Sequence, residues 1–310
     1  MPVVLIVIAA IALLYLVFVI GPAIVAFNKV YEKKSDKPLE KIDISKTYFA
    51  PYEKDMRDAA ARLEEKYNFK RVQITSFDGL KLYADFIDLG YDKTVACFHG
   101  YSATPLINFG MPAEYYIAAG YNVLLVYQRG HSVSGGEYST LGLLEKYDVL
   151  SWIDWLDSQP ASQAVLHGIS MGATTLAYVS PEIKSEKVKA LVIDCGYLSP
   201  WLQIYRDCKR RHMPGRLILP WVNLFSKCKY KLDLKQSTTE PLKQNKIPAF
   251  FLHGKADATV PYNDTEVNYS ACASEKKMLL PDKLHHTLAF ATGDNSVRAE
   301  VFEFLHRYIK

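Results

Sequence analysis

Hydrophobic residues are distributed along this chain in two ways: one long run at the start, then short runs separated by amphipathic stretches. Residues 3–20 are continuously apolar, and the residues as far as Phe27 extend the run without a charged side chain. About 20 apolar residues suffice for a helix to cross a bilayer. The pattern therefore predicts a transmembrane helix over residues 1–28, with residues 3–27 in the membrane.

The flanks of this run favour a retained anchor over a cleaved signal peptide. No basic residue precedes the run, which is longer than the apolar part of a signal peptide, although cleavage after Ala26 stays an alternative. The basic residues that follow the run are Lys29, Lys33, Lys34 and Lys37. By the positive-inside rule they favour a cytoplasmic location for the rest of the chain, but the flank before the run is so short that the orientation stays open.

Beyond the run, residues 29–46 are charged and predict a juxtamembrane linker, and residues 47–310 predict one large domain. Apolar residues at helical spacing between Met56 and Tyr67 indicate an amphipathic helix. Two alternating segments around Asp78-Gly79 indicate an antiparallel hairpin. The further expected strands are 94–98, 122–127, 164–167, 190–194, 249–253 and 277–280. The expected helices lie around 113–119, at 143–156, after Ser170, and at 263–272 and 296–308.

This alternation is typical of a doubly wound α/β fold, a mostly parallel sheet with helices on both faces. One insertion, about residues 197–245, interrupts it and is too long for a simple connection. Its aromatic residues are Trp201, Tyr205, Trp221, Phe225 and Tyr230. We expect the insertion to form a small helical cap with an apolar lining.

Charge and cysteine content exclude some classes of function. The net charge of +4 is too small to indicate a nucleic-acid partner. The five cysteines have no metal-binding spacing, so neither a zinc site nor a disulfide framework is expected, although Cys208 and Cys228 stay a conceivable pair in an oxidising compartment. The basic run 209–212 is interpreted as a solvated helix face, with contact to an anionic substrate or to lipid headgroups as the alternative.

The segment Gly168-Ile169-Ser170-Met171-Gly172 carries the most specific chemical signal. It fits the G-x-S-x-G pattern and lies between an expected strand and an expected helix. In such a turn the serine adopts a strained backbone, and the glycines allow the chain to pass close by. Ser170 is therefore the predicted nucleophile.

Three other predicted strand ends offer partners for Ser170, because functional groups gather at the carboxyl edge of such a sheet. His99-Gly100-Tyr101 predicts an oxyanion hole formed by the backbone N–H of Tyr101 together with that of Met171. Asp257 is the predicted orienting acid and His286 the predicted base. The alternatives are Asp194 as the acid and His285 as the base.

Taken together, His99-Gly100, Arg129-Gly130-His131, the serine turn, Asp194-Cys195-Gly196-Tyr197, His253-Gly254 with Asp257, and His286 resemble the α/β-hydrolase superfamily over about residues 70–310. More narrowly, the chain resembles membrane-anchored serine hydrolases of the YqkD-like and BEM46-like kind. The resemblance implies Ser170 as nucleophile, Asp257 as acid, His286 as base and the Tyr101 and Met171 amides as oxyanion hole. Tyr127 and Ser132 replace the Asp and Gly that many members have in the Arg-Gly-His loop.

The predicted activity is acyl transfer to Ser170 followed by hydrolysis, with no cofactor and no metal. A small carboxylic ester is the first expected substrate. A peptidase or thioesterase on the same scaffold and a non-catalytic tethered binding protein are the alternatives. The oligomeric state is not predicted.

Overall fold

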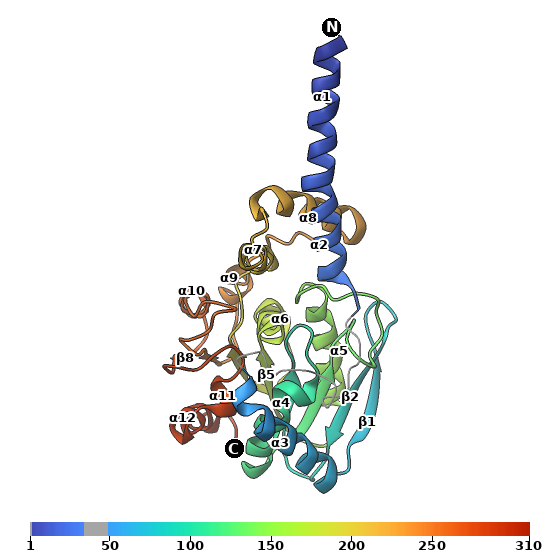
Figure 1. Cartoon of the computed structure of the whole chain (residues 1–310). Coiled ribbons are helices and arrows are strands. Elements are labelled where there is room, and N and C mark those ends of the chain that lie inside the picture. The colour runs from blue at the N-terminus through green and yellow to red at the C-terminus, as the bar shows by residue number, and fades with distance from the viewer. Residues whose placement is uncertain (1, 34–48) are drawn as a thin grey trace. The chain divides into compact units, whose positions relative to one another are not determined.

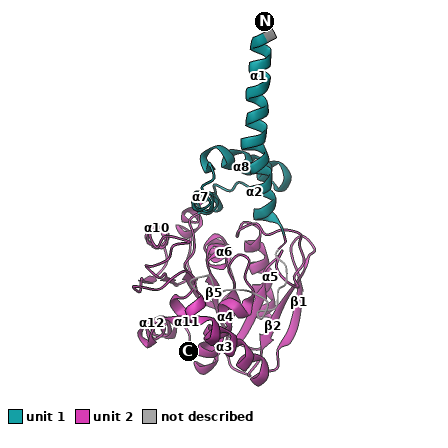
Figure 2. Ribbon diagram, in the orientation of Figure 1, with its two compact units in different colours: residues 1–32, 199–236 teal, residues 33–198, 237–310 magenta. Residues whose placement is uncertain are grey.

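The computed structural model describes residues 2–33 and 49–310 and divides the chain into two compact units (Figures 1 and 2). Of the described residues, the larger unit contains 33, 49–198 and 237–310, and the smaller unit contains 2–32 and 199–236. Most of the predicted linker, 34–46, lies outside the described residues.

The larger unit is built on an eight-stranded sheet in the order β1-β2-β4-β3-β5-β6-β7-β8. The strands are β1 (Lys70–Thr75), β2 (Lys81–Ile87), β3 (Lys93–Phe98), β4 (Asn122–Tyr127), β5 (Gln163–Ile169), β6 (Val188–Asp194), β7 (Ala249–Leu252) and β8 (Lys276–Leu279). The predicted hairpin is present, since β1 and β2 pair antiparallel, and β2 also pairs antiparallel with β4. All later pairs are parallel, which confirms the predicted mostly parallel sheet.

Helices cover both faces of this sheet, as a doubly wound fold requires. One hydrophobic cluster joins the sheet to α3 (Glu53–Lys66), α4 (Pro105–Ala118), α11 (Ala289–Thr292) and α12 (Asn295–His306). The other joins it to α5 (Glu145–Asp157), α6 (Met171–Val179), α9 (Thr239–Leu242) and α10 (Asn263–Ala271). Short 3₁₀ turns lie at Ala50–Tyr52 (η3) and Ser180–Glu182 (η4).

Helix α4 begins well before the predicted 113–119. Thr104 caps it by accepting the N–H of Ile107, and Pro105 occupies its first turn, where a missing N–H costs nothing. Pro112 lies inside the helix and is buried. Because an internal proline is a strong sequence signal against a helix, the sequence placed the start too late.

The smaller unit joins the N-terminal helix to two helices of the insertion (Figure 2). The N-terminal helix consists of α1 (Pro2–Tyr15), a π-helical turn η1 (Leu16–Ile20) and α2 (Gly21–Tyr31). The wider turn precedes Pro22, which has no N–H to continue the α-helical ladder. The helix thus runs past residue 28, where the predicted span ends. By length and composition it qualifies as a membrane span, and a signal sequence passes the same test.

The insertion contributes α7 (Pro200–Arg210) and α8 (Gly215–Tyr230) to this unit. Its aromatic residues were expected to line a substrate cavity, but several pack on the N-terminal helix instead. The ring of Tyr230 lies 4.8 Å from that of Tyr31 and 5.9 Å from that of Phe27, centroid to centroid. The Tyr31 hydroxyl also lies 2.6 Å from the Ser226 Oγ.

The end of the predicted insertion also differs from the structure. Residues 237–245 belong to the larger unit, because α9 buries Leu242 completely in the core of that unit. All five cysteines are free, so the alternative pair of Cys208 and Cys228 is not formed. Cys228 is exposed and the other four are buried.

Candidate active site

Ser170 lies on the turn between β5 and α6, at the carboxyl edge of the sheet. Its backbone angles are φ 54° and ψ −110°, a conformation that non-glycine residues rarely adopt and that costs about 1–3 kcal/mol. The flanking glycines permit this turn: a Cβ on Gly172 would collide with the carbonyl oxygen of Phe98, and one on Gly168 with the backbone of Gly172. The strand, turn and helix that the G-x-S-x-G pattern requires are all present.

We expect Gly172→Ala to lower the free energy of unfolding by about 1–3 kcal/mol or more, because the new methyl group has no space beside β3. Urea denaturation of the purified chain in mild detergent measures this change. Gly110→Ala is the matched control, since the nearest atom to a Cβ there, on α3, is 3.6 Å away and alanine favours a helix. Equal stability of the two variants would contradict the crowding argument.

The structure brings Ser170, His286 and Asp257 together in one chain of hydrogen bonds. The Ser170 Oγ lies 2.9 Å from the His286 Nε2, and the His286 Nδ1 lies 2.5 Å from the Asp257 Oδ2. The serine hydroxyl donates to Nε2 and the imidazole N–H donates to the carboxylate, which is the proton arrangement a general base needs. His285, the alternative base, is exposed, and its Nδ1 contacts the carbonyl of Ala256 instead.

Asp257 is held as an anion by four donors. Its Oδ1 accepts the N–H groups of Thr259 and Val260 at 2.7 and 2.9 Å, and its Oδ2 accepts His253 Nε2 at 2.9 Å besides His286. Burial opposes ionisation, but the charge of His286 and these hydrogen bonds outweigh it and hold the pKa of Asp257 well below its usual range. The carboxylate therefore stays charged beside the imidazole.

His253 is a member of this cluster to which the sequence assigned no role. Its Nδ1 accepts the hydroxyl of Thr265 at 2.6 Å, so its Nε2 carries the proton that Asp257 accepts. The spacing of four residues between His253 and Asp257, across a turn that follows a strand, was the available signal.

Asp194, the alternative acid, ends β6 but is not a partner of the imidazole. The hydrogen bonds of His286 go to Ser170 and Asp257. Burial raises the pKa of Asp194 to about 7, against a weaker opposing effect of the charge of His253. Geometry and electrostatics therefore both favour Asp257 over Asp194.

The raised pKa of Asp194 also makes the free energy of unfolding depend on pH. Its folded pKa of about 7 lies above the usual value of 3.8 for an aspartate, so the native state retains a proton that the unfolded state loses between these pH values. Its contribution to stability is present below pH 4 and is lost as the pH rises through 7. We expect Asp194→Asn to gain stability relative to wild type, by a few kcal/mol, as the pH rises from about 5 to about 8. Urea denaturation at both pH values measures this, and parallel stability curves would contradict it.

The loop of the predicted oxyanion hole lies directly beside Ser170. A Cβ on Gly100 would be 3.3 Å from the Ser170 Cβ, and Met171 begins α6, so its amide is among the unpaired first N–H groups of that helix by position. The Gly100 N–H donates to Asn108 Oδ1 at 2.7 Å, and the Ser102 N–H donates to His131 Nε2 at 3.2 Å. The oxyanion role of Tyr101 and Met171 stays a prediction.

Asn108 and His131 thus hold the oxyanion loop from two sides. His131 Nδ1 donates to the carbonyl of Arg129 at 2.9 Å, which fixes the ring with Nε2 as the acceptor. The sequence assigned no role to Asn108, and His131 contributed only to the family resemblance. Neither position carries a signal of its own, because the contacts depend on how α4 and the loop after β4 meet.

One group of side chains near Ser170 has the composition of a metal site but fits a metal poorly. Ligand atoms of Cys195, Asp257 and His286 all lie within 4.8 Å of one another. A thiol binds a metal as the thiolate, whereas burial raises the pKa of Cys195 well above its usual value. The facing atoms of Asp257 and His286 are already used in their mutual hydrogen bond.

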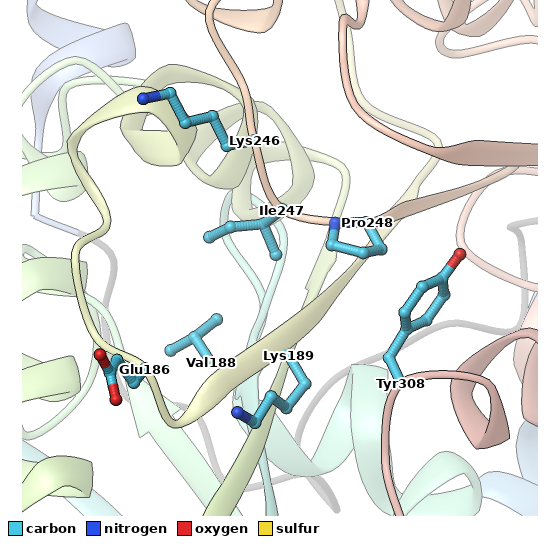
Figure 3. A pocket seen from close by; sticks show the side chains of 7 residues that line it. All are labelled: Glu186, Val188, Lys189, Lys246, Ile247, Pro248 and Tyr308. Carbon is cyan, nitrogen blue, oxygen red and sulfur yellow. The ribbon is translucent and has the colours of Figure 1, made fainter.

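A surface hollow of about 430 Å³ lies at the opposite edge of the sheet (Figure 3). Its lining includes Val188, the first residue of β6, together with Pro248 and Tyr308. Because Asp194 ends the same strand at the other edge, this hollow is not adjacent to Ser170. It contributes nothing to the chemistry described above.

A model of the family described as X-Pro dipeptidyl-peptidase (S15 family) matches residues 46–227. The matched part is more than half of the 310 residues. The chain belongs to this family. It is a hydrolase of the α/β-hydrolase superfamily, and the predicted fold and superfamily are confirmed.

Curated relatives of this S15-family chain include two bacterial proteins that are named as uncharacterised. YqkD of Bacillus subtilis (strain 168) is 24% identical over 217 residues, which cover 69% of this chain and 71% of YqkD. YfhR of Escherichia coli (strain K12) is 25% identical over 258 residues, which cover 78% and 82%. The predicted likeness to YqkD is thereby confirmed.

Solved structures of similar proteins include esterases. The Pyrococcus furiosus esterase Pf2001 is 25% identical, with a TM-score of 0.68 over 80% of this chain and 94% of that chain. The α/β hydrolase GrgF from Penicillium sp. sh18 is 16% identical, with a TM-score of 0.63 over 78% and 99%, and shows the fold alone.

Proposed function

We propose that this S15-family hydrolase is a membrane-anchored serine hydrolase that cleaves carboxylic esters through an acyl-enzyme on Ser170. The observation that carries the proposal is the hydrogen-bonded series Ser170, His286 and Asp257, with 2.9 and 2.5 Å between partners. The strained backbone of Ser170 supports it, because such strain is concentrated at functional sites.

The mechanism follows from the proton positions. His286 Nε2 takes the proton of the Ser170 hydroxyl as the oxygen attacks the acyl carbon, and the same proton then passes to the leaving alcohol. A water molecule, deprotonated by His286, next attacks the acyl-enzyme, and as the bond to Ser170 breaks the proton passes from His286 to the Ser170 oxygen and the acid is released. Asp257 keeps the imidazole in the required tautomer and stabilises its positive charge.

The developing oxyanion needs donors that are in place before the reaction. We assign this role to the backbone N–H groups of Tyr101, which follows Gly100 on the loop beside Ser170, and of Met171, the first residue of α6. A single such donor raises kcat by a factor of about 10²–10³. His131 and Asn108 support the assignment because they position the loop that carries Tyr101.

The choice of ester over amide has support from the structural neighbours, while the family description favours a second candidate, an X-Pro dipeptidyl-peptidase. A panel of nitrophenyl esters of increasing acyl length and Xaa-Pro nitroanilides separates the two. We expect hydrolysis of the esters and no measurable hydrolysis of the Xaa-Pro nitroanilides, which an X-Pro dipeptidyl-peptidase would cleave even though an amide has the poorer leaving group. Efficient cleavage of an Xaa-Pro nitroanilide would overturn the ester assignment and favour the peptidase, and a thioester panel extends the comparison.

The anchorage belongs to the same proposal. The helix Val3–Tyr31 is long and apolar enough to cross a bilayer. Phe27 and Tyr31 pack among aromatic residues of α8 and are almost fully buried. These contacts support a retained helix, since removing it would uncover the aromatic face of α8.

A further inference from the structure

Helix α8 is apolar on its exposed side as well as on its buried side. Ile218, Leu219 and Val222 are buried within the unit. The opposite face carries Leu217, Pro220, Trp221, Leu224 and Cys228, at positions that recur every three or four residues. Leu217 is 54% exposed and Leu224 is 45% exposed. A helix on a water-covered surface normally presents charged or polar residues there, so this face calls for an apolar neighbour.

The N-terminal helix indicates what that neighbour is. Its large apolar residues are exposed from Val3 to Phe18, whereas Val19 is buried. Those 16 residues are about 24 Å long, which is about 6 Å short of the hydrocarbon thickness of a bilayer. The first turns of α2 must therefore also lie in the hydrocarbon, and α2 is the segment on which α8 packs.

A direct contact places α8 beside the last part of the apolar run. The Trp221 Nε1 donates to the Tyr15 hydroxyl at 2.9 Å, and the two rings meet edge to face at 6.4 Å. Because each of the two polar groups satisfies the other, both rings can lie among the acyl chains just below the headgroups. Figure 2 shows α8 beside the lower part of the N-terminal helix in the same unit.

The charge of the insertion complements a lipid surface. Residues 199–236 contain nine Lys or Arg and only two acidic residues, a net charge of +7 in a chain whose total is +4. Arg216 precedes the apolar face of α8, and Lys229 and Lys231 follow it, all of them exposed. An apolar face bordered by cations is the pattern of a helix that lies on an anionic bilayer.

We propose that α8 is an interfacial helix whose face of Leu217, Pro220, Trp221, Leu224 and Cys228 lies in the headgroup–acyl boundary of a bilayer that contains anionic lipid. This inference rests on the proposed anchorage and goes beyond it, because it gives the insertion a membrane surface of its own. It also gives a reason for the exposed basic run 209–212 at the end of α7, which would contact the anionic headgroups next to the apolar face of α8.

Site-specific fluorescence quenching tests this with the full chain. Cys228 is the exposed thiol among the five cysteines, so the unmodified chain is labelled there with an environment-sensitive fluorophore. Vesicles of phosphatidylcholine and phosphatidylglycerol carry a quencher on the lipid just below the headgroups. A second label at Leu224→Cys, in a Cys228→Ser background, reports the middle of the same face.

Two control positions use that same background. Val267→Cys on α10 is matched to Leu224 because both side chains are 45% exposed. Ile8→Cys, in the exposed part of α1, reports insertion of the anchor. We expect quenching at Cys228 and Leu224 to exceed that at Val267 at least about threefold, and to fall when phosphatidylglycerol is left out, while quenching at Ile8 does not change.

The remaining outcomes overturn the inference in distinguishable ways. Quenching at Ile8 without quenching at Cys228 and Leu224 leaves the anchorage intact and shows that α8 does not enter the lipid. A label at Leu224 that is shielded only at high protein concentration identifies a second copy as the occupant of this face. Absence of quenching at Ile8 overturns the anchorage, and the inference falls with it.

Discussion

Replacing Ser170 by alanine is expected to lower kcat/KM for an ester substrate by about four to six orders of magnitude. Ser170 supplies the oxygen that forms the acyl-enzyme, and its Oγ is the atom to which His286 is hydrogen bonded. Without it, only binding and the oxyanion donors act on a direct attack by water, and these leave a small residual rate. Initial rates on the best nitrophenyl ester measure the loss.

The same variant tests the chemistry independently of substrate choice. A fluorophosphonate probe reacts with an activated serine, so wild type should be labelled at one site and Ser170→Ala should not. Ser180→Ala is the matched control, since Ser180 is also buried and lies at the end of α6, with its hydroxyl on the carbonyl of Ala177. Absence of labelling in wild type would favour the alternative of a tethered binding protein. Labelling that persists in Ser170→Ala would show that another residue is the nucleophile.

The larger unit was predictable because its signals are local. The turn at Asp78-Gly79, the alternation of strands and helices and the glycines around Ser170 each reflect a backbone requirement within a few residues. The order of Ser170, Asp257 and His286 along the chain then follows from the carboxyl ends of the strands meeting at one edge. The sequence favoured His286 as the base and left His285 as the alternative, and the hydrogen bonds to Ser170 and Asp257 are made by His286.

What the sequence did not predict depends on contacts between distant segments. The aromatic residues of the insertion have the composition of a cavity lining. Phe225 and Tyr230, however, contact a helix about 200 residues earlier in the chain. An apolar run long enough for a membrane gives no hint that one of its sides is covered by protein. His253 was likewise recognisable as a strand-end residue, whereas its role depends on Thr265 one helix further on.

Asp257→Asn is expected to lower kcat for the ester by about four orders of magnitude while KM changes little. The amide is isosteric, so the N–H groups of Thr259 and Val260 still have an oxygen to bind. What changes is the proton: an Asn side chain that donates toward His286 Nδ1 leaves Nε2 protonated, and Nε2 can then no longer accept the proton of Ser170. The loss therefore appears in the chemical step, and initial-rate kinetics separate it from binding.

Asp194→Asn is the matched control, because it makes the same substitution on a buried carboxyl that ends the neighbouring strand. Asp194 makes no hydrogen bond to His286 among those the structure describes, so we expect its variant to keep kcat within about threefold of wild type. The two variants also differ in the quantity that changes. Asp194→Asn is expected to alter how the free energy of unfolding depends on pH, whereas Asp257→Asn is expected to lower kcat. A large loss of kcat in Asp194→Asn, with kcat retained in Asp257→Asn, would show that Asp194 and not Asp257 is the orienting acid. A loss in both, with stability unchanged, would mean that the two carboxyl groups act as one unit around His253.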